Sequence, residues 1–305
     1  TLIGISLVLF AVVALAPGDP FAELAQNPNV PPELRQQLRQ QLGIDDPVYI
    51  QYARWAASMV QGNWGVSFSN RVPVSELIWG RLPTTLFVVG SSYLVALLIA
   101  VPAGILSAVK QYSWLDNLAS TFAFLGYSLP TFFTGLLFIL IFTVTLGWLP
   151  EVYTTNIQET GWRWALAMLR QAAMPVAVLA LFQSAELARF IRASVLEVLH
   201  LDYVRTARAK GLSESRVVIR HVVRNALIPV ITVMALQVPG LFTGALVTEQ
   251  IFRGPGIGSL LIRSLNSHDT PVVMGIFFTY SILVVVFTLA ADIAYGILDP
   301  RIRFD

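Results

Sequence analysis

Long apolar segments without charged side chains dominate this sequence and restrict what it can fold into. Leu82–Val109 contains no Asp, Glu, Lys or Arg. An α-helix of that length, rising about 1.5 Å per residue, exceeds the roughly 30 Å of hydrocarbon in a bilayer. Charged residues make up only 12% of the chain, against about 25% in a typical soluble domain. The sequence therefore predicts an all-α membrane protein.

We expect six membrane-spanning helices. Besides Leu82–Val109, the apolar segments are Thr1–Ala16, Leu115–Leu149, Met174–Leu199, Ala226–Val247 and Pro271–Ile297. The first is shorter than a full span, which we interpret as a helix truncated at its start; a cleaved signal peptide is the alternative, although no basic residues precede it. Pro130 interrupts the third segment, either as a simple kink or as part of a cavity lining.

The chain then divides into a first helix at 1–16, an external loop at 17–81, a five-helix core at 82–298 and a tail at 299–305. The loop is partly helical by pattern, at residues 33–42 and after Asp46-Pro47. It either receives a substrate-delivering protein or only caps the helices. Basic residues exceed acidic ones between Glu186 and Arg224 and recur at Lys110 and in the tail. Such loops face the cytoplasm, so we expect both termini there and the loop at 17–81 outside.

One polar, basic segment, Leu201–Pro229, stands out within the apolar part of the chain. Asp202 is placed to cap a short helix at 203–210, and Gly211 to end that helix in a left-handed turn. Ser213 is placed to cap a second helix, with Glu214 in its first turn. Arg216, Arg220 and Arg224 then follow every four residues, a stripe suited to phosphate headgroups or to an acidic partner.

A helix as short as 203–210 is not stable alone in water, so it must dock on another surface. Its small residues Thr206, Ala207 and Ala209 would let a partner protein approach closely. A basic loop that serves only membrane orientation is the alternative. We interpret the helix as a docking element for another protein, and Pro229 as a hinge where the segment enters the membrane.

Motifs for catalysis are absent. The sequence has no Cys, no GxxxxGK[ST] phosphate-binding loop and no HExxH or GxSxG motif. Glu186 and Arg189 lie three residues apart on one helix face, within pairing reach. Glu186 is the one serious candidate for an ion-relay group of a secondary carrier; the alternative is an ion pair at a helix end. A membrane pore without a phosphate-binding loop still needs an energy source, and we expect a partner protein to supply it.

Several motifs resemble a known family. RTARAKGL at residues 205–212, followed by RHVVRNALIP at 220–229, closely resembles the EAA-loop signature of inner-membrane permease subunits of ABC importers, in the dipeptide, oligopeptide and nickel group. Further matching segments are Pro17–Pro20, Gly62–Phe68, Tyr127–Gly135, Val195–Leu199, Thr248–Gly258 and Leu298–Phe304. The long external loop is similar to that of the first of the two permease subunits in such systems.

The resemblance implies a type I ABC importer permease fold in a bacterial-type plasma membrane. It implies a second permease subunit (a heterodimer is favoured over a homodimer), two P-loop ATPase subunits and an external substrate-binding protein, with no nucleic acid. ATP and Mg would bind to the ATPase subunits, so this chain would carry no cofactor, no metal and no catalytic residue. Di- and oligopeptides are the expected solutes, with nickel complexes or glutathione as alternatives. An ion-coupled carrier using Glu186 is a further alternative.

By position, the resemblance places the ATPase-coupling residues within the EAA loop at 200–224. They are Asp202, Tyr203, Val204, Arg205, Thr206, Ala207, Arg208, Ala209, Lys210, Gly211, Leu212, Ser213 and Glu214. Arg205 stands where many permeases have an acid. The candidates for hinges or gates are Pro130, Pro229 and Pro239, and those for the translocation path are Tyr127, Ser128, Gln183, Glu186 and Gln237.

Overall fold

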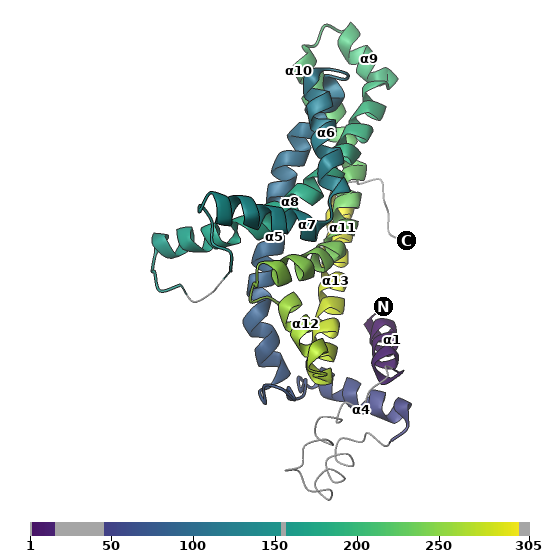
Figure 1. Ribbon diagram of the computed structural model, residues 1–305. Coiled ribbons are helices and arrows are strands. Elements are labelled where there is room, and N and C mark those ends of the chain that lie inside the picture. The colour runs from purple at the N-terminus through teal and green to yellow at the C-terminus, as the bar shows by residue number, and fades with distance from the viewer. Residues whose placement is uncertain (1, 16–45, 154–156, 299–305) are drawn as a thin grey trace, which may run out of the picture. The chain divides into compact units, whose positions relative to one another are not determined.

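The structure is a computed structural model that describes residues 2–15, 46–153 and 157–298. In these ranges the chain is helical and contains no strand, only an isolated bridge between Val66 and Pro73. The α-helices are α1 (Leu2–Leu15), α4 (Val48–Val60), α5 (Val74–Val109), α6 (Trp114–Ser128), α7 (Thr131–Phe138), α8 (Trp162–Leu199), α9 (Asp202–Ala209), α10 (Glu214–Val217), α11 (Arg224–Ile251), α12 (Ile257–Asn266) and α13 (Thr270–Leu298). Two π-helical segments, η1 (Ile139–Thr145) and η2 (Val218–Val223), continue α7 and precede α11 (Figure 1).

Several helices have the length and composition of membrane spans. Among the described residues, four stretches qualify: Val74–Val109, Trp162–Leu199, Glu214–Met234 and Thr270–Ala290. Trp114–Ser128 together with Thr131–Thr145 makes a fifth if the pair is one broken span. The shorter apolar helix α1 occupies the place of the first expected span. The prediction of an all-α membrane protein is confirmed, and each expected apolar segment is helical over most of its described length.

The third apolar segment is not one continuous helix. Its two halves, α6 and the α7–η1 stretch, are bent by 103° relative to each other. Leu129 ends α6 in an extended conformation, and Pro130 precedes the first residue of α7. Proline has no N–H to continue the helix, and it disfavours helical geometry in the residue before it. The break at Pro130 therefore confirms the expected interruption and is sharper than a simple kink.

Two expected boundaries were wrong because helix-forming polar residues extend the apolar runs. α8 begins at Trp162 rather than Met174, and Pro175 lies inside it. The added segment, WRWALAMLRQAA, is rich in Ala, Leu, Arg and Met, which favour helix. α5 likewise begins at Val74 rather than Leu82. The expected helix after Asp46-Pro47 is confirmed as α4, which Pro47 precedes; the pattern at 33–42 lies outside the described residues.

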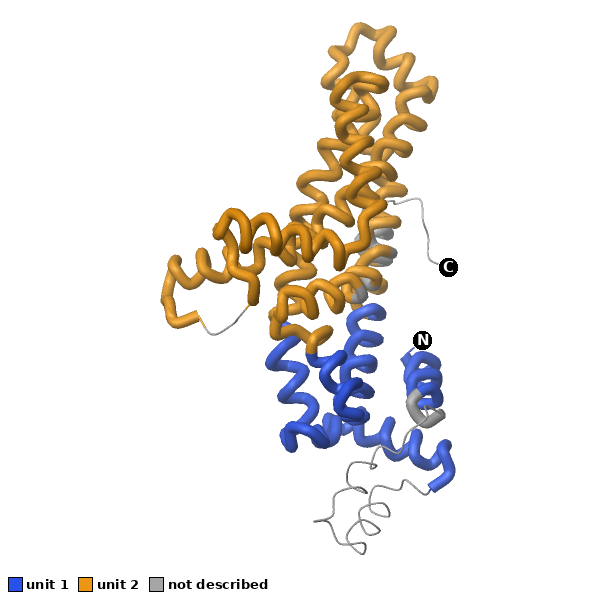
Figure 2. The backbone as a smooth tube through the Cα atoms, viewed as in Figure 1, with its two compact units in different colours: residues 1–83, 260–285 blue, residues 84–259, 286–305 orange. Residues whose placement is uncertain are grey.

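Contacts divide the chain into two compact units (Figure 2). Unit 1 contains Thr1–Pro83 and Leu260–Val285. In it, the carboxylate of buried Asp269 accepts hydrogen bonds from the Ser67 hydroxyl at 2.5 Å and from the backbone N–H groups of Phe68 and Ser69, each at 3.1 Å. These bonds fix the segment before α5 onto the turn before α13. At least this part of the expected loop is a folded element.

Unit 2 contains Thr84–Ser259 and Val286–Asp305. Its core is a cluster of fully buried aliphatic side chains from α5, α8, α9, α10, η2 and α11. Leu187, Ile191 and Val195 on α8 lie at its centre, each 0% exposed. This core packs the short helix α9 against the long helices α5, α8 and α11.

Candidate functional site

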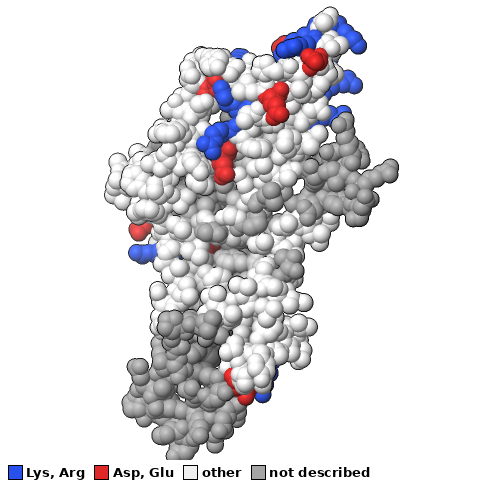
Figure 3. All heavy atoms as spheres, turned by 90° about the vertical axis from the view of Figure 1, so that its right-hand side faces the viewer, with Lys and Arg blue, Asp and Glu red and all other residues white. Residues whose placement is uncertain are grey.

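α9 is held onto its own chain by one face. Val204 is 0% exposed and Ala207 is 6% exposed, and both belong to the unit 2 core together with Val217 and Val222. The other α9 side chains, including Arg205 and Thr206, are exposed. An eight-residue helix gains little from its own hydrogen bonds, so this apolar contact is what stabilises it. Lys and Arg side chains gather at the end of unit 2 where α9 and α10 lie (Figure 3).

Two expectations about α9 are corrected. Ala207 points into the core of this chain, so it does not form the close-approach surface that we expected with Thr206 and Ala209. Leu201, not Asp202, precedes the helix, and no side chain caps it. Asp202 is the first helical residue, and its carboxylate lies 3.5 Å from the Arg205 guanidinium. An acid in the first turn still interacts favourably with the helix dipole.

The turn after α9 has the predicted geometry. Gly211 has a φ of +78°, in the left-handed region that only glycine adopts without strain. Arg208 and Glu214 close the turn with two hydrogen bonds, Nη2 to Oε1 at 2.7 Å and Nε to Oε2 at 3.1 Å. This bonding raises the pKa of Arg208 above its ordinary value, so the guanidinium stays charged.

Ser213 lies at the predicted start of the second helix, although its side chain makes no capping bond. Its backbone carbonyl accepts the N–H groups of Arg216 and Val217, at 2.9 and 3.0 Å. Downstream, Pro229 lies inside α11, so its missing N–H leaves the carbonyl of Asn225 without the usual helical donor. The six-residue π-helical segment η2 ends just before α11 and has its own wider turn. Pro239 is also within α11, but its side chain lies outside the described ones.

α8 leads into α9 and is bonded to its neighbours by a buried ion pair. The Arg192 guanidinium donates from Nε and Nη2 to the two carboxylate oxygens of Asp116 on α6, at 2.8 and 2.9 Å. Ser107 on α5 donates to the same carboxylate, and the backbone N–H of Tyr112 adds a bond of 2.9 Å. Asp116 is 3% exposed. Three helices are thus joined at one charged cluster, which no local sequence pattern indicated.

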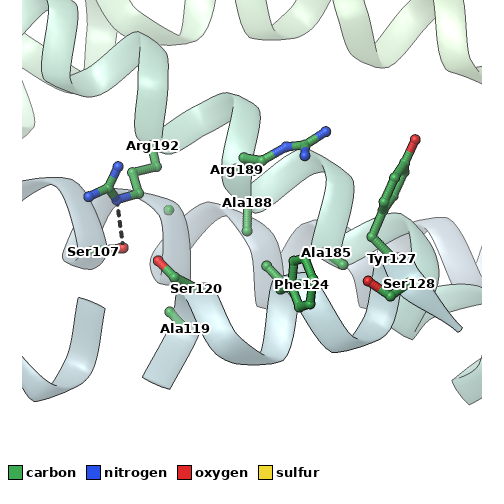
Figure 4. Close-up of a pocket in the computed structure, with 13 residues that line it drawn as sticks. Ser107, Ala119, Ser120, Phe124, Tyr127, Ser128, Ala185, Ala188, Arg189 and Arg192 are labelled. Carbon is green, nitrogen blue, oxygen red and sulfur yellow. Dashed lines mark hydrogen bonds between the residues drawn. The ribbon is translucent and has the colours of Figure 1, made fainter. Parts of the chain in front are cut away.

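A cavity of about 720 Å³ lies beside this cluster, between α5, α6 and α8 (Figure 4). Tyr127 and Ser128, two of the expected path residues, line it at the broken end of α6. Most of the remaining lining residues are Gly, Ala or Ser, and two arginines, Arg189 and Arg192, complete it. The chain just before Pro130 therefore borders a cavity, which favours the second of the two interpretations of this proline over a simple kink.

The other expected path residues do not line this cavity. Gln183 is 6% exposed and lies 3.5 Å from the Ser92 hydroxyl on α5. Glu186 is half-buried, and no ion pair with Arg189 exists in the described part of the chain. Instead, the Arg189 guanidinium carbon lies 5.1 Å from the ring centroid of Tyr127. Gln237 is half-buried on α11.

A second buried carboxylate organises the matched segment Thr248–Gly258. Glu249 is 3% exposed; it accepts from the Thr85 hydroxyl at 2.6 Å and from the Gly258 N–H at 2.7 Å. A Cβ added to Gly256 would lie 2.1 Å from this carboxylate, so glycine is required there. The Ile257 N–H donates to Thr85 at 2.9 Å. The segment thus fixes the first residues of α12 onto α5, a role that no sequence pattern indicated.

A helical chain with membrane-length helices, an open cavity between three of them and a short helix after the longest one is consistent with the membrane component of a transport system. A family model described as "binding-protein-dependent transport system inner membrane component" matches residues 100–304. A second model, for the N-terminal part of the membrane component of binding-protein-dependent transport systems, matches residues 1–89. The chain belongs to this family of inner membrane transport components.

Individual relatives cover nearly the whole chain. The oligopeptide transport system permease protein AppB of Bacillus subtilis (strain 168) is 42% identical over 306 residues, covering 99% of this chain and 95% of the relative. The glutathione transport system permease protein GsiC of Escherichia coli (strain K12) is 39% identical over 304 residues, covering 100% of this chain and 95% of that relative. This chain is therefore an ABC importer permease of the peptide and nickel group.

Two solved structures share the fold. The methionine ABC transporter MetNI in an inward-facing conformation superposes with a TM-score of 0.59 and 16% identity, covering 73% of this chain and 96% of that one. An amino acid ABC transporter crystallised with histidines superposes with a TM-score of 0.53 and 15% identity, covering 75% of this chain and 95% of that one. At these identities the similarity concerns the fold alone, which is that of ABC importer permeases.

Proposed function

We propose that this chain forms part of the path through which an ATP-driven importer passes di- and oligopeptides into the cell. The names of AppB and GsiC support a peptidic solute, since glutathione is itself a tripeptide. Glutathione is therefore the alternative solute with an observation in its favour, ahead of nickel complexes. An external binding protein would deliver the solute, and a second permease subunit, different from this one, would complete the path.

The energy of ATP binding and hydrolysis would reach this chain through α9. The observation that carries this proposal is the burial of Val204 and Ala207 in this chain, because it leaves the opposite face of α9 exposed on a rigidly held helix. A helix seated in a groove is a common mode of protein recognition. The groove would belong to an ATPase subunit that binds ATP and Mg, since this sequence has no phosphate-binding loop. α9 and both termini then lie in the cytoplasm.

Motion of α9 would pass to the spans through bonded contacts. α8 is one helix from Trp162 to Leu199, directly before α9, and Arg192 fixes it to Asp116 on α6. Closure of two ATPase subunits on ATP would move the docked helices and switch the path between inward-open and outward-open states. ATP can drive this only by binding the two states with different affinity. The path candidates Tyr127, Ser128, Gln183, Glu186 and Gln237 and the hinge candidates Pro130, Pro229 and Pro239 are proposed to act in this switch.

Two substitutions at Thr206 test the docking. Its side chain is exposed on α9, and its hydroxyl donates to the Asp202 carbonyl at 2.9 Å. We expect Thr206→Trp to reduce co-purification of the ATPase subunits and peptide-stimulated ATP hydrolysis at least several-fold, because the indole occupies the contact space. Thr206→Ser keeps the local hydrogen bond and should behave as wild type. Equal ATPase binding and hydrolysis in both variants, at equal membrane levels, would contradict the proposal.

A further inference from the structure

Arg189 is a charged residue of α8 that lines the cavity between α5, α6 and α8. The α8 helix is long enough to cross a membrane, and the Arg189 side chain is exposed on it. The neighbouring Arg192 is neutralised by Asp116, at 2.8 and 2.9 Å. Arg189 has no carboxylate within ion-pair distance in the parts of the chain that the structure describes. Its positive charge is therefore available to a ligand.

The Tyr127 ring holds this guanidinium in place without using its N–H donors. A cation over an aromatic face, here at 5.1 Å, is attracted to the ring electrons. The planar guanidinium still presents hydrogen-bond donors in a fork that matches a carboxylate. The hydroxyls of Ser120 and Ser128 line the same cavity and add further polar groups, while Phe124 contributes an apolar wall (Figure 4).

The size of the cavity suits a small solute. Its volume of about 720 Å³ falls within the range of roughly 300 to 1,000 Å³ that small-molecule sites occupy. The space arises because small side chains such as Ala103, Ala123 and Ala188 face it from three helices. A site with one available cation, a few hydroxyls and small walls fits a molecule with an anionic end and variable remaining groups.

We propose that this cavity binds the terminal carboxylate of a small peptide, with Arg189 as the carboxylate-binding residue. The inference deepens the proposed function and rests on it, because it takes the solute to be peptidic. A peptide always has a terminal carboxylate, whatever its side chains, so one arginine serves a broad range of sequences. Arg189 also lies on the same continuous helix as Leu199, the last residue of α8, about 15 Å further along.

The test uses the complete transporter, with its ATPase and binding-protein partners, in proteoliposomes. The probes are trialanine and trialanine amide, which differ only in the terminal carboxylate. Arg189→Gln removes the charge at nearly constant shape, and Arg189→Lys keeps the charge without the fork. Arg163→Gln is the matched control: Arg163 also lies on α8 over an aromatic ring, 5.8 Å from the Trp162 centroid, but outside the cavity.

We expect Arg189→Gln to lower the ratio of trialanine to trialanine amide uptake by about 10-fold, the scale of a lost charge-assisted hydrogen bond. Arg189→Lys should lower it less, and Arg163→Gln should leave it unchanged. The preference of the binding protein cancels, because the same protein serves every variant. Retained uptake of the amide shows that the Arg189→Gln transporter is folded.

Three results would overturn the inference. One is an unchanged ratio in Arg189→Gln while wild-type uptake is normal. Another is an equal loss of both peptides, which would make Arg189 structural. The third is a defect that follows the phosphatidylglycerol content of the vesicles rather than the peptide terminus, which would assign the cavity to a lipid headgroup. Wild-type complexes that import neither tripeptide would overturn the proposed function and this inference with it.

Discussion

Arg192 and Asp116, 76 residues apart in sequence, form a two-bond ion pair that joins α8 to α6 at 2.8 and 2.9 Å. Asp116 is almost fully buried, and the Arg192 side chain is 28% exposed. Breaking a buried pair by removing one charge leaves the other charge uncompensated, which costs more than the pair itself contributes. This pair bonds α6 to α8, the helix that leads into α9.

Asp116→Asn should therefore destabilise the protein markedly. We expect a loss of about 2–4 kcal/mol, somewhat below the range for a fully buried pair because Arg192 retains some solvent contact. Asp46→Asn is the matched control, since Asp46 pairs with Arg54 at 2.5 Å with its side chain 35% exposed and that of Arg54 60% exposed. Exposed pairs contribute about 1 kcal/mol or less. Thermal unfolding of the purified complex measures the loss of stability in both variants. Equal losses in Asp116→Asn and Asp46→Asn would contradict the assigned role of Asp116.

The turn after α9 should depend on glycine at position 211. Gly211→Ala places a Cβ in left-handed geometry, which costs roughly 1–2 kcal/mol, although the space around it is open. Gly211→Asn should cost less, because Asn tolerates this conformation. Gly80→Ala provides the comparison, since Gly80 is helical and equally uncrowded, and alanine favours helix there. Unfolding temperatures and ATPase co-purification should fall only for the substitutions at Gly211, with alanine worse than asparagine.

Glycine at position 256 is expected to be essential for a different reason. Gly256→Ala would bring its Cβ to 2.1 Å from the Glu249 carboxylate, so the bonds to Thr85 and Gly258 must break or shift. We expect a loss of at least 2 kcal/mol in stability, the scale of leaving a buried polar group unsatisfied, together with loss of peptide uptake. Gly90→Ala, at an exposed helical glycine with open space, should be tolerated. Normal unfolding and uptake in Gly256→Ala would show that Glu249 does not organise this segment.

Local patterns in the sequence predicted the features that depend on local physics. The length of Leu82–Val109 required a helix because unsatisfied backbone groups are costly in lipid. Gly211 and Pro130 act within a few residues of themselves, so their effects on turn and helix end followed directly. The short helix at α9 was predicted within one residue at each end for the same reason.

The features that sequence reasoning missed join residues distant along the chain. Asp116 with Arg192, and Glu249 with Thr85, pair across different helices, and no periodicity relates them. Ala207 was assigned to the partner-facing side because composition does not tell which face of a short helix its own chain covers. α12 was not predicted, since its start is set by bonds to Glu249 rather than by a local cap.

α9 is proposed to lie in the cytoplasm and to dock in an ATPase subunit. The sequence contains no cysteine, so single introduced thiols can be labelled without background. Thr206→Cys places a thiol on the exposed face of α9, and Asn63→Cys places one in the exposed turn after α4. A membrane-impermeant maleimide is applied to right-side-out and inside-out vesicles, with and without the ATPase subunits.

We expect the thiol of Thr206→Cys to react only in inside-out vesicles and to be protected there when the ATPase subunits are bound. The thiol of Asn63→Cys should react only from the opposite side. Labelling of position 206 from the external side, or equal labelling with and without bound ATPase, would contradict the proposed docking of α9.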